Sequence, residues 1–169
     1  ALCAGSASTA GSNSFDIGHI DQHKALGGII HYVSLVDGAD FIISGPSTVR
    51  VGDTSANIYA ADWGNILVDS GASNCEFSDD VFSKLVQAAT TAAPAYAELW
   101  SSSNRCMVVS SCQFDLDILP VIVFDFLDEH QERFTIDFSP REYTIWRSGD
   151  SLCLNIKPMS ALGSPNSER

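Results

Sequence analysis

The chain of 169 residues is long enough for one domain with a substantial core, and its hydrophobic content of 45% is ordinary for a globular protein. Nine Lys and Arg against 21 Asp and Glu give a formal net charge of −12, which repels phosphate backbones and anionic lipid surfaces, so we expect no nucleic-acid partner. No apolar run approaches the roughly 20 residues that cross a bilayer. No basic-then-apolar signal segment opens the chain. We therefore expect a soluble protein with no membrane partner.

The first third of the sequence divides into a small-residue segment and a strand-rich segment. Residues 1–14 are almost entirely Ala, Gly, Ser, Thr and Asn, which predicts a flexible linker or terminus. Between residues 15 and 59, short apolar runs alternate with turn signals, which is typical of β-strands. His19 and His23 flank Asp21, an arrangement that can clasp a metal ion. A polar turn explains the same three residues, and we predict no metal site.

The next feature is an apolar run that breaks at an acidic residue. Ile66 to Val68 are apolar and two of them are β-branched, which predicts the end of a buried strand. Asp69 then places a carboxylate at the rim of a sheet. Gly71 allows a sharp turn, and Ser70 and Ser73 supply hydroxyl groups beside the acid. A strand followed by an Asx-type turn is the alternative interpretation.

Helical spacing dominates the following segment. Ser78 is a good N-cap, and two aspartates follow in the first turn, where the helix dipole favours negative charge. Apolar residues then recur every three or four positions, which predicts a helix over about residues 79–91 that packs on the sheet behind the Asp69 strand. A second helical turn is expected through Leu99, and residues 101–104 form a polar loop.

Residues 106–156 return to strands. A dense β-forming run at 121–126, a charged hairpin tip at 128–132 and an alternating run at 134–136 predict a hairpin, with a short helix-like stretch near Pro140. This region also carries acidic residues that could attract a cation, but solvated strand edges explain them and are the favoured interpretation. These residues are Asp115, Asp117, Asp125, Asp128 and Glu129.

Taken in order, these segments resemble the carboxy-terminal lobe of the pepsin-like aspartic peptidases. The signature of that family is an apolar run followed by Asp-Thr/Ser-Gly-Thr/Ser/Ala, and residues 66–73 fit it. Flanking segments resemble the same lobe in the same order: residues 15–21, residues 28–35, Cys112, residues 118–124, residues 138–145, Cys153 and Ala161-Leu162-Gly163. The resemblance implies a mainly β domain over residues 15–163, one lobe of a pepsin-like double-ψ β-barrel with one or two short helices, and a tail at 164–169.

The resemblance also implies an activity, the hydrolysis of peptide bonds by an activated water without a cofactor. This chemistry needs two carboxylates that share one proton, one acting as general base and the other, protonated, polarising the carbonyl. Asp69 would be one member of the pair, Ser70 would bond across to the equivalent position, and Gly71 would leave room for the water. Many members carry a hydroxyl where this chain has Ala72, so we expect activity shifted towards neutral pH.

The chain departs from the family at its end. The two closing strands that follow the segment resembling Ala161-Leu162-Gly163 are absent, and so is the other lobe with its aspartate and flap. We therefore expect an aspartic endopeptidase lobe that is inactive alone and needs an amino-terminal lobe with a second catalytic aspartate, on a separate chain or a missing segment, to act on a peptide or protein substrate. The alternatives are a catalytically silent peptide-binding or inhibitor protein on the same scaffold and, third, a symmetric homodimeric peptidase of the retroviral kind.

Five cysteines without a C-x-x-C pair favour disulfides over a metal site. The resemblance pairs Cys112 with Cys153. Cys3, Cys75 and Cys106 remain, any two of which could form a further bridge, and the odd count predicts one free thiol or a bond to another polypeptide. Disulfides predict the secretory pathway, with an extracellular or vacuole/lysosome-like destination.

Overall fold

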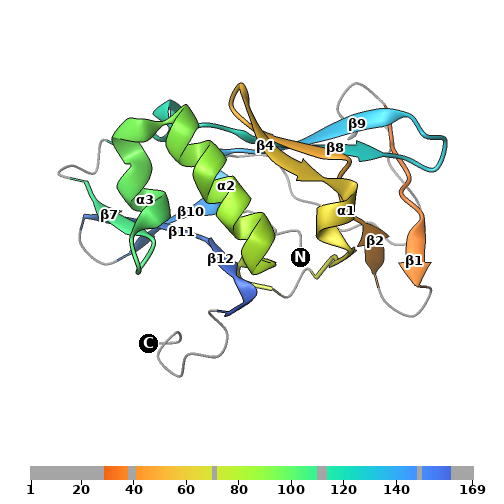
Figure 1. Cartoon of the computed structure of the whole chain (residues 1–169), viewed down its shortest axis with the longest axis horizontal. Coiled ribbons are helices and arrows are strands. Elements are labelled where there is room, and N and C mark those ends of the chain that lie inside the picture. The colour runs from red at the N-terminus through yellow and green to blue at the C-terminus, as the bar shows by residue number, and fades with distance from the viewer. Residues whose placement is uncertain (1–28, 38–40, 70–71, 110–113, 148–149, 161–169) are drawn as a thin grey trace, which may run out of the picture.

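A computed structural model describes residues 29–37, 41–69, 72–109, 114–147 and 150–160 (Figure 1). The predicted linker at residues 1–14 and tail at residues 164–169 lie outside these ranges. The same holds for His19, Asp21 and His23.

Within the described ranges the chain is mainly β, as predicted, and twelve strands form four separate sheets without closing a barrel. The strands are β1 (Leu35–Asp37), β2 (Ile42–Ser44), β3 (Thr48–Val51), β4 (Thr54–Tyr59), β5 (Asn65–Leu67), β6 (Cys75–Phe77), β7 (Cys106–Val108), β8 (Ile122–Leu127), β9 (Arg133–Phe138), β10 (Thr144–Arg147), β11 (Ser151–Leu154) and β12 (Ile156–Pro158). The helices are α1 (Ala60–Trp63), α2 (Asp79–Ala92), η3 (Pro94–Tyr96), α3 (Ala97–Ser101), η4 (Leu116–Ile118) and α4 (Pro140–Tyr143). None of the described helices is long and apolar enough to cross a membrane.

The largest sheet is antiparallel and has the strand order β4-β3-β8-β9. The β3–β4 hairpin turns at Gly52, whose φ of 56° suits glycine because other residues are strained there. The β8–β9 hairpin pairs Ile122 with Phe138 and Leu127 with Arg133, which confirms the hairpin that the sequence predicts. Aromatic rings from these strands fill the core, with Phe124 next to Phe138 at 6.3 Å between ring centroids.

Helix α2 covers this sheet by packing against β3 and β4, and Figure 1 shows it running alongside α3. Its bounds, Asp79–Ala92, confirm the predicted helix, and the Ser78 hydroxyl accepts a hydrogen bond from the Val81 amide at 3.4 Å, as an N-cap does. One stripe of the helix is buried, as the apolar spacing predicts. The second helical turn is also confirmed, by η3 and α3. The buried residues of α2 are Val81, Phe82, Leu85, Ala88 and Ala89.

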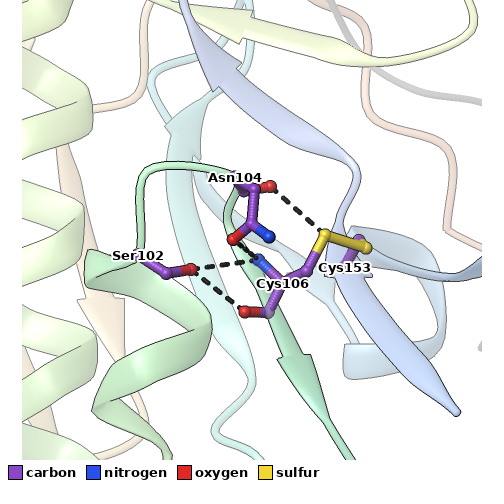
Figure 2. The surroundings of a disulfide bond; sticks show 4 residues. All are labelled: Ser102, Asn104, Cys106 and Cys153. Carbon is purple, nitrogen blue, oxygen red and sulfur yellow. Dashed lines mark hydrogen bonds between the residues drawn. A yellow bond between two sulfur atoms is a disulfide. The ribbon is translucent and has the colours of Figure 1, made fainter. Parts of the chain in front are cut away.

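A three-stranded antiparallel sheet, β10-β11-β7, carries the disulfide. Cys106 on β7 lies directly opposite Cys153 on β11, and their sulfurs are bonded (Figure 2). Ser102 holds the β7 end of this bridge, because its hydroxyl accepts a hydrogen bond from the Cys106 amide at 3.1 Å and donates one to the Cys106 carbonyl at 3.0 Å. The predicted pairing of Cys153 with Cys112 is therefore wrong, because the register of β7 against β11 brings Cys106 to Cys153. Cys112 itself lies outside the described ranges.

Two small sheets frame the remaining part of the molecule. One is antiparallel with the order β1-β2-β5, and the other pairs β6 with β12 in parallel. The parallel pair joins Cys75 to Ile156 and Phe77 to Pro158, strands that are far apart in sequence. The strand before Asp69, β5, belongs to the first of these sheets, and the strand after it, β6, belongs to the second.

Candidate functional site

Strand β5 leads the chain to Asp69. Ile66 is partly buried against the core, whereas Leu67 is 48% exposed. The prediction of a buried strand is therefore wrong, because only one face of β5 is covered, and only in part. The pairing with β2 extends one residue past the strand, because the Val68 amide donates a hydrogen bond to the Phe41 carbonyl at 2.8 Å. The strand thus ends immediately before the acid, as the apolar run predicts.

Asp69 lies exposed in the turn that follows β5. The Ala72 amide donates a hydrogen bond to the Asp69 carbonyl at 3.3 Å, which closes the turn. Ala72 is half-buried and Ser73 is exposed, whereas Ser70 and Gly71 lie outside the described ranges. Chemically, the arrangement presents a carboxylate at the end of a strand, where another molecule can reach it.

The sheet that carries Asp69 has an apolar exposed surface. Phe41, which is paired with Val68, is 72% exposed, and Leu35 and Val36 on β1 are about half exposed. With Leu67 of β5, this makes four large, exposed apolar side chains. Three of them belong to the β1-β2-β5 sheet, and Phe41 directly precedes its middle strand. Exposed apolar surface of this kind is typical of a site that another polypeptide covers.

An apolar cavity of about 360 Å³ borders β5. Three strands line it with consecutive residues, namely residues 65–67 of β5, residues 75–78 on and after β6, and residues 136–138 of β9. The aromatic side chains of Trp63, Phe124 and Phe126 also line the cavity. The sequence does not predict this cavity, because it depends on how three separate sheets meet. Asp69 is not among the residues that line it.

The acidic cluster named in the sequence is dispersed in the structure. Asp115 caps η4 by accepting the Asp117 amide at 3.0 Å. Asp117 lies 3.6 Å from Arg141, and Asp125 accepts the hydroxyl of Thr48 at 2.6 Å. Among the residues that the structure describes, no group of three or more His, Cys, Asp or Glu is placed to hold a metal ion.

Asp128 is instead part of a buried pair that the sequence does not indicate. Its Oδ2 lies 3.1 Å from Nδ1 of His31, and its Oδ1 accepts the amides of His130 and Glu132, each at 2.9 Å. The hydrogen bond from His31, followed by the two amide hydrogen bonds, holds the pKa of the Asp128 carboxyl below its ordinary value of 3.8. The ring of His31 also stacks on Phe134 at 4.7 Å. These contacts of His31 connect the segment before β1 to the tip of the β8–β9 hairpin.

Lys84 of α2 forms ion pairs with two carboxylates. Its Nζ lies 2.8 Å from Asp62 of α1 and 3.1 Å from Asp80. The hydrogen bond with Asp62, and then the one with Asp80, raise the pKa of Lys84. The spacing of Asp80 and Lys84 is a signal that sequence reasoning could have used, whereas the contact with Asp62 requires the fold.

The sequence matches no model of a known protein family and has no significant match among curated proteins. The resemblance to the pepsin-like peptidases therefore depends on the segments quoted above, and the chemistry of the site must be argued from its geometry.

Proposed function

We propose that this chain is one lobe of a pepsin-like aspartic endopeptidase and that Asp69 is one half of its catalytic carboxylate pair. The observation that carries the proposal is the position of Asp69, exposed at the end of β5 in a turn closed by the Ala72 amide. A carboxylate in this position can approach a second carboxylate on a partner lobe without burial in its own domain. The mainly β character of the chain also supports it.

The proposed reaction requires the second carboxylate. Two carboxyl groups about 3 Å apart cannot both ionise, so they share a proton and titrate as a pair. The ionised group removes a proton from water, which attacks the peptide carbonyl, while the protonated group polarises that carbonyl. Ser70 would bond across to the equivalent residue of the partner, and Gly71 would leave room for the water. The chain alone is therefore inactive.

The partner would be an amino-terminal lobe of the same class. The exposed apolar side chains of Leu35, Val36, Phe41 and Leu67 support a partner that docks on this sheet, because they would leave water on docking. In the assembled lobe the four open sheets would belong to a double-ψ β-barrel. A peptide substrate would lie between the two lobes, close to Asp69.

The disulfide supports an oxidising compartment for this enzyme. Cys106 and Cys153 are bonded, and Cys75 is disulfide-bonded too. Such bonds persist in secreted proteins and are rare in the cytosol. We therefore place the enzyme in the secretory pathway, with an extracellular or vacuole/lysosome-like destination.

The proposal is tested by the intact mass of the native, non-reduced protein, followed by the mass after reduction. We expect a second polypeptide, or a longer form of this one, that carries another Asp-Thr/Ser-Gly sequence, and peptide cleavage that pepstatin inhibits. A lone chain without activity would instead support a lobe used for binding. Two identical copies with activity would support the symmetric peptidase.

A further inference from the structure

The apolar cavity lies between strand edges that no other strand of the described residues pairs with. Within the described ranges, β5 and β9 each end the order of their sheets, and β6 pairs with β12 alone. Side chains alternate between the two faces of a strand, so a cavity that touches consecutive residues borders the edge or the end of that strand. The whole of β5 and the whole of β6 line the cavity, together with residues 136–138 of β9. The cavity therefore runs along open edges.

Two residues of β5 direct their backbone N–H and C=O groups towards the edge of the strand that does not pair with β2. The Val68 amide bonds the Phe41 carbonyl, so this is a hydrogen-bonded pair of the β2–β5 ladder. Such pairs alternate with non-hydrogen-bonded pairs along antiparallel strands. By the observed register, Ile42–Leu67 and Ser44–Asn65 are the non-hydrogen-bonded pairs. Leu67 and Asn65 therefore direct their N–H and C=O groups away from β2, as the template for a further strand does.

The lining indicates which side chains a further strand would carry. Most of it is apolar and includes Ile66, Leu67 and Phe77, with Phe77 stacked on Phe124, and the volume of about 360 Å³ falls within the range of ligand sites. The carboxylates of Glu76, Asp137 and Glu142 also border it. Lys157 offsets part of this charge, because its Nζ lies 3.4 Å from Oε1 of Glu76. The border is therefore negative.

Trp63 adds an unmet requirement for a hydrogen-bond acceptor. Its ring lines the cavity beside Phe77, with ring centroids 5.5 Å apart. Its indole nitrogen is buried and has no hydrogen-bond partner among the residues that the structure describes. A buried N–H without an acceptor is costly, and a peptide strand supplies carbonyl oxygens.

We propose that this cavity binds an extended segment of another polypeptide by strand addition, with apolar side chains turned into the cavity and Lys or Arg side chains towards Glu76 and Asp137. The main-chain hydrogen bonds of β5 would give affinity, and the apolar pocket and acidic border would give specificity. Asp69 is not among the residues that line the cavity, and the peptide-binding test does not require peptidase activity.

The test uses a fluorescein-labelled peptide of eight residues that alternates valine and lysine, with fluorescence anisotropy as the measurement. Two matched peptides carry N-methyl groups on every valine or on every lysine, which removes the N–H donors of one strand edge at a time and keeps the side chains. We expect the parent peptide to bind and at least one methylated peptide to lose more than tenfold in affinity. We also expect slower hydrogen exchange at the Asn65 and Leu67 amides when the parent peptide is bound.

Charge variants test the orientation of the bound segment. Asp137→Lys should weaken binding of the valine–lysine peptide at least threefold and improve binding of a matched eight-residue peptide that alternates valine and glutamate. Glu76→Lys should act in the same direction, which keeps the test decisive if one variant does not fold. Asp53→Lys, an exposed acid in the β3–β4 turn, is the matched control and should change neither affinity. Equal binding of all three valine–lysine peptides, no binding of the parent peptide, or equal effects of Asp137→Lys and Asp53→Lys would overturn the proposal.

Discussion

The two sides of the molecule differ in how completely they bury their own apolar surface. On the α2 side, Leu85 and the facing strands β3 and β4 form a closed core with Val49 and Ile58, all at most 1% exposed. On the Asp69 side, Phe41 is 72% and Leu67 is 48% exposed, and β5 is the edge of its sheet among the described residues. The α2 side buries its own apolar side chains, whereas the Asp69 side exposes apolar side chains and, among the described residues, an unpaired strand edge.

This difference separates a part of the chain that serves as scaffold from a part that we propose as an interface. A core that is closed contributes to stability and not directly to recognition. An apolar, open-edged region costs stability unless something covers it, so its presence next to Asp69 is the physical reason to expect a partner there. Mutations should therefore affect stability on the α2 side and association on the Asp69 side.

The same substitution on both sides gives the largest expected contrast in stability. Leu85→Ala removes a side chain that is 0% exposed and should lower the free energy of unfolding by about 3 kcal/mol, because the helix cannot close the cavity it leaves. Leu67→Ala removes a side chain that is half in water and should cost less than about 1 kcal/mol. Urea denaturation measures both values. Equal losses would show that the two sides are not different in this way.

A second prediction concerns the junction between the two sides. Gly45 joins β2 to β3 and leaves no room for a side chain, because an added Cβ would collide with Cβ and Cγ of Trp63. Gly45→Ala should lower the free energy of unfolding by about 2 kcal/mol, through displacement of Trp63 from Phe77 and Phe124. Thermal denaturation and tryptophan fluorescence measure the effect. An unchanged midpoint would mean that the junction can yield without strain.

The Asp128 contact predicts a dependence on pH. Because the folded state lowers the pKa of this carboxyl below 3.8, its contribution to stability is present above that value and is lost as the pH falls through the lowered pKa. Asp128→Asn should therefore be less stable than the wild type at pH 7, where His31 and the amides of His130 and Glu132 lose a charged acceptor, and the difference should shrink as the pH is lowered from 3.8. Denaturation at pH 7 and at a series of pH values below 3.8 checks it. A difference that stays constant with pH would contradict the ionic contribution.

The smallest expected effect concerns Ala72. A serine there can donate a hydrogen bond that favours the ionised carboxylate, so Ala72→Ser in the assembled enzyme should move the pH profile of activity towards acid by roughly half a pH unit, since one hydrogen bond to a charged group changes little more in a partly exposed site. The ratio kcat/KM measured across pH reports the shift. A profile that does not move would remove the proposed role of this position.

The parts of the fold that the sequence predicts are those with local causes. The N-cap at Ser78 and the apolar spacing after it are sufficient to predict α2, because helix contacts join residues three and four apart. The β8–β9 hairpin is predicted for a similar reason, since alternating runs flank a charged tip. The end of β5 at Asp69 also follows from a local change from apolar to polar residues.

The parts that the sequence does not predict depend on register and on distant pairing. Cys106 and Cys112 are close to each other in the sequence, and the pairing of Cys153 with Cys106 depends on the register of β7 against β11. The parallel pairing of β6 with β12 has no local signal either. The cavity beside β5 depends on how the sheets that contain β5, β6 and β9 meet, and for that reason it could not be predicted.

The central claim is that Asp69 is half of a catalytic pair, and the most direct test is peptidase activity of the native, non-reduced protein with and without pepstatin. Wild type, Asp69→Asn and the exposed control Asp53→Asn should be compared in the same assembly. We expect the wild type and the control to cleave peptides and to be inhibited, and Asp69→Asn to lose on the order of 10³-fold in kcat with unchanged stability. Pepstatin-sensitive activity that survives in Asp69→Asn would contradict the claim.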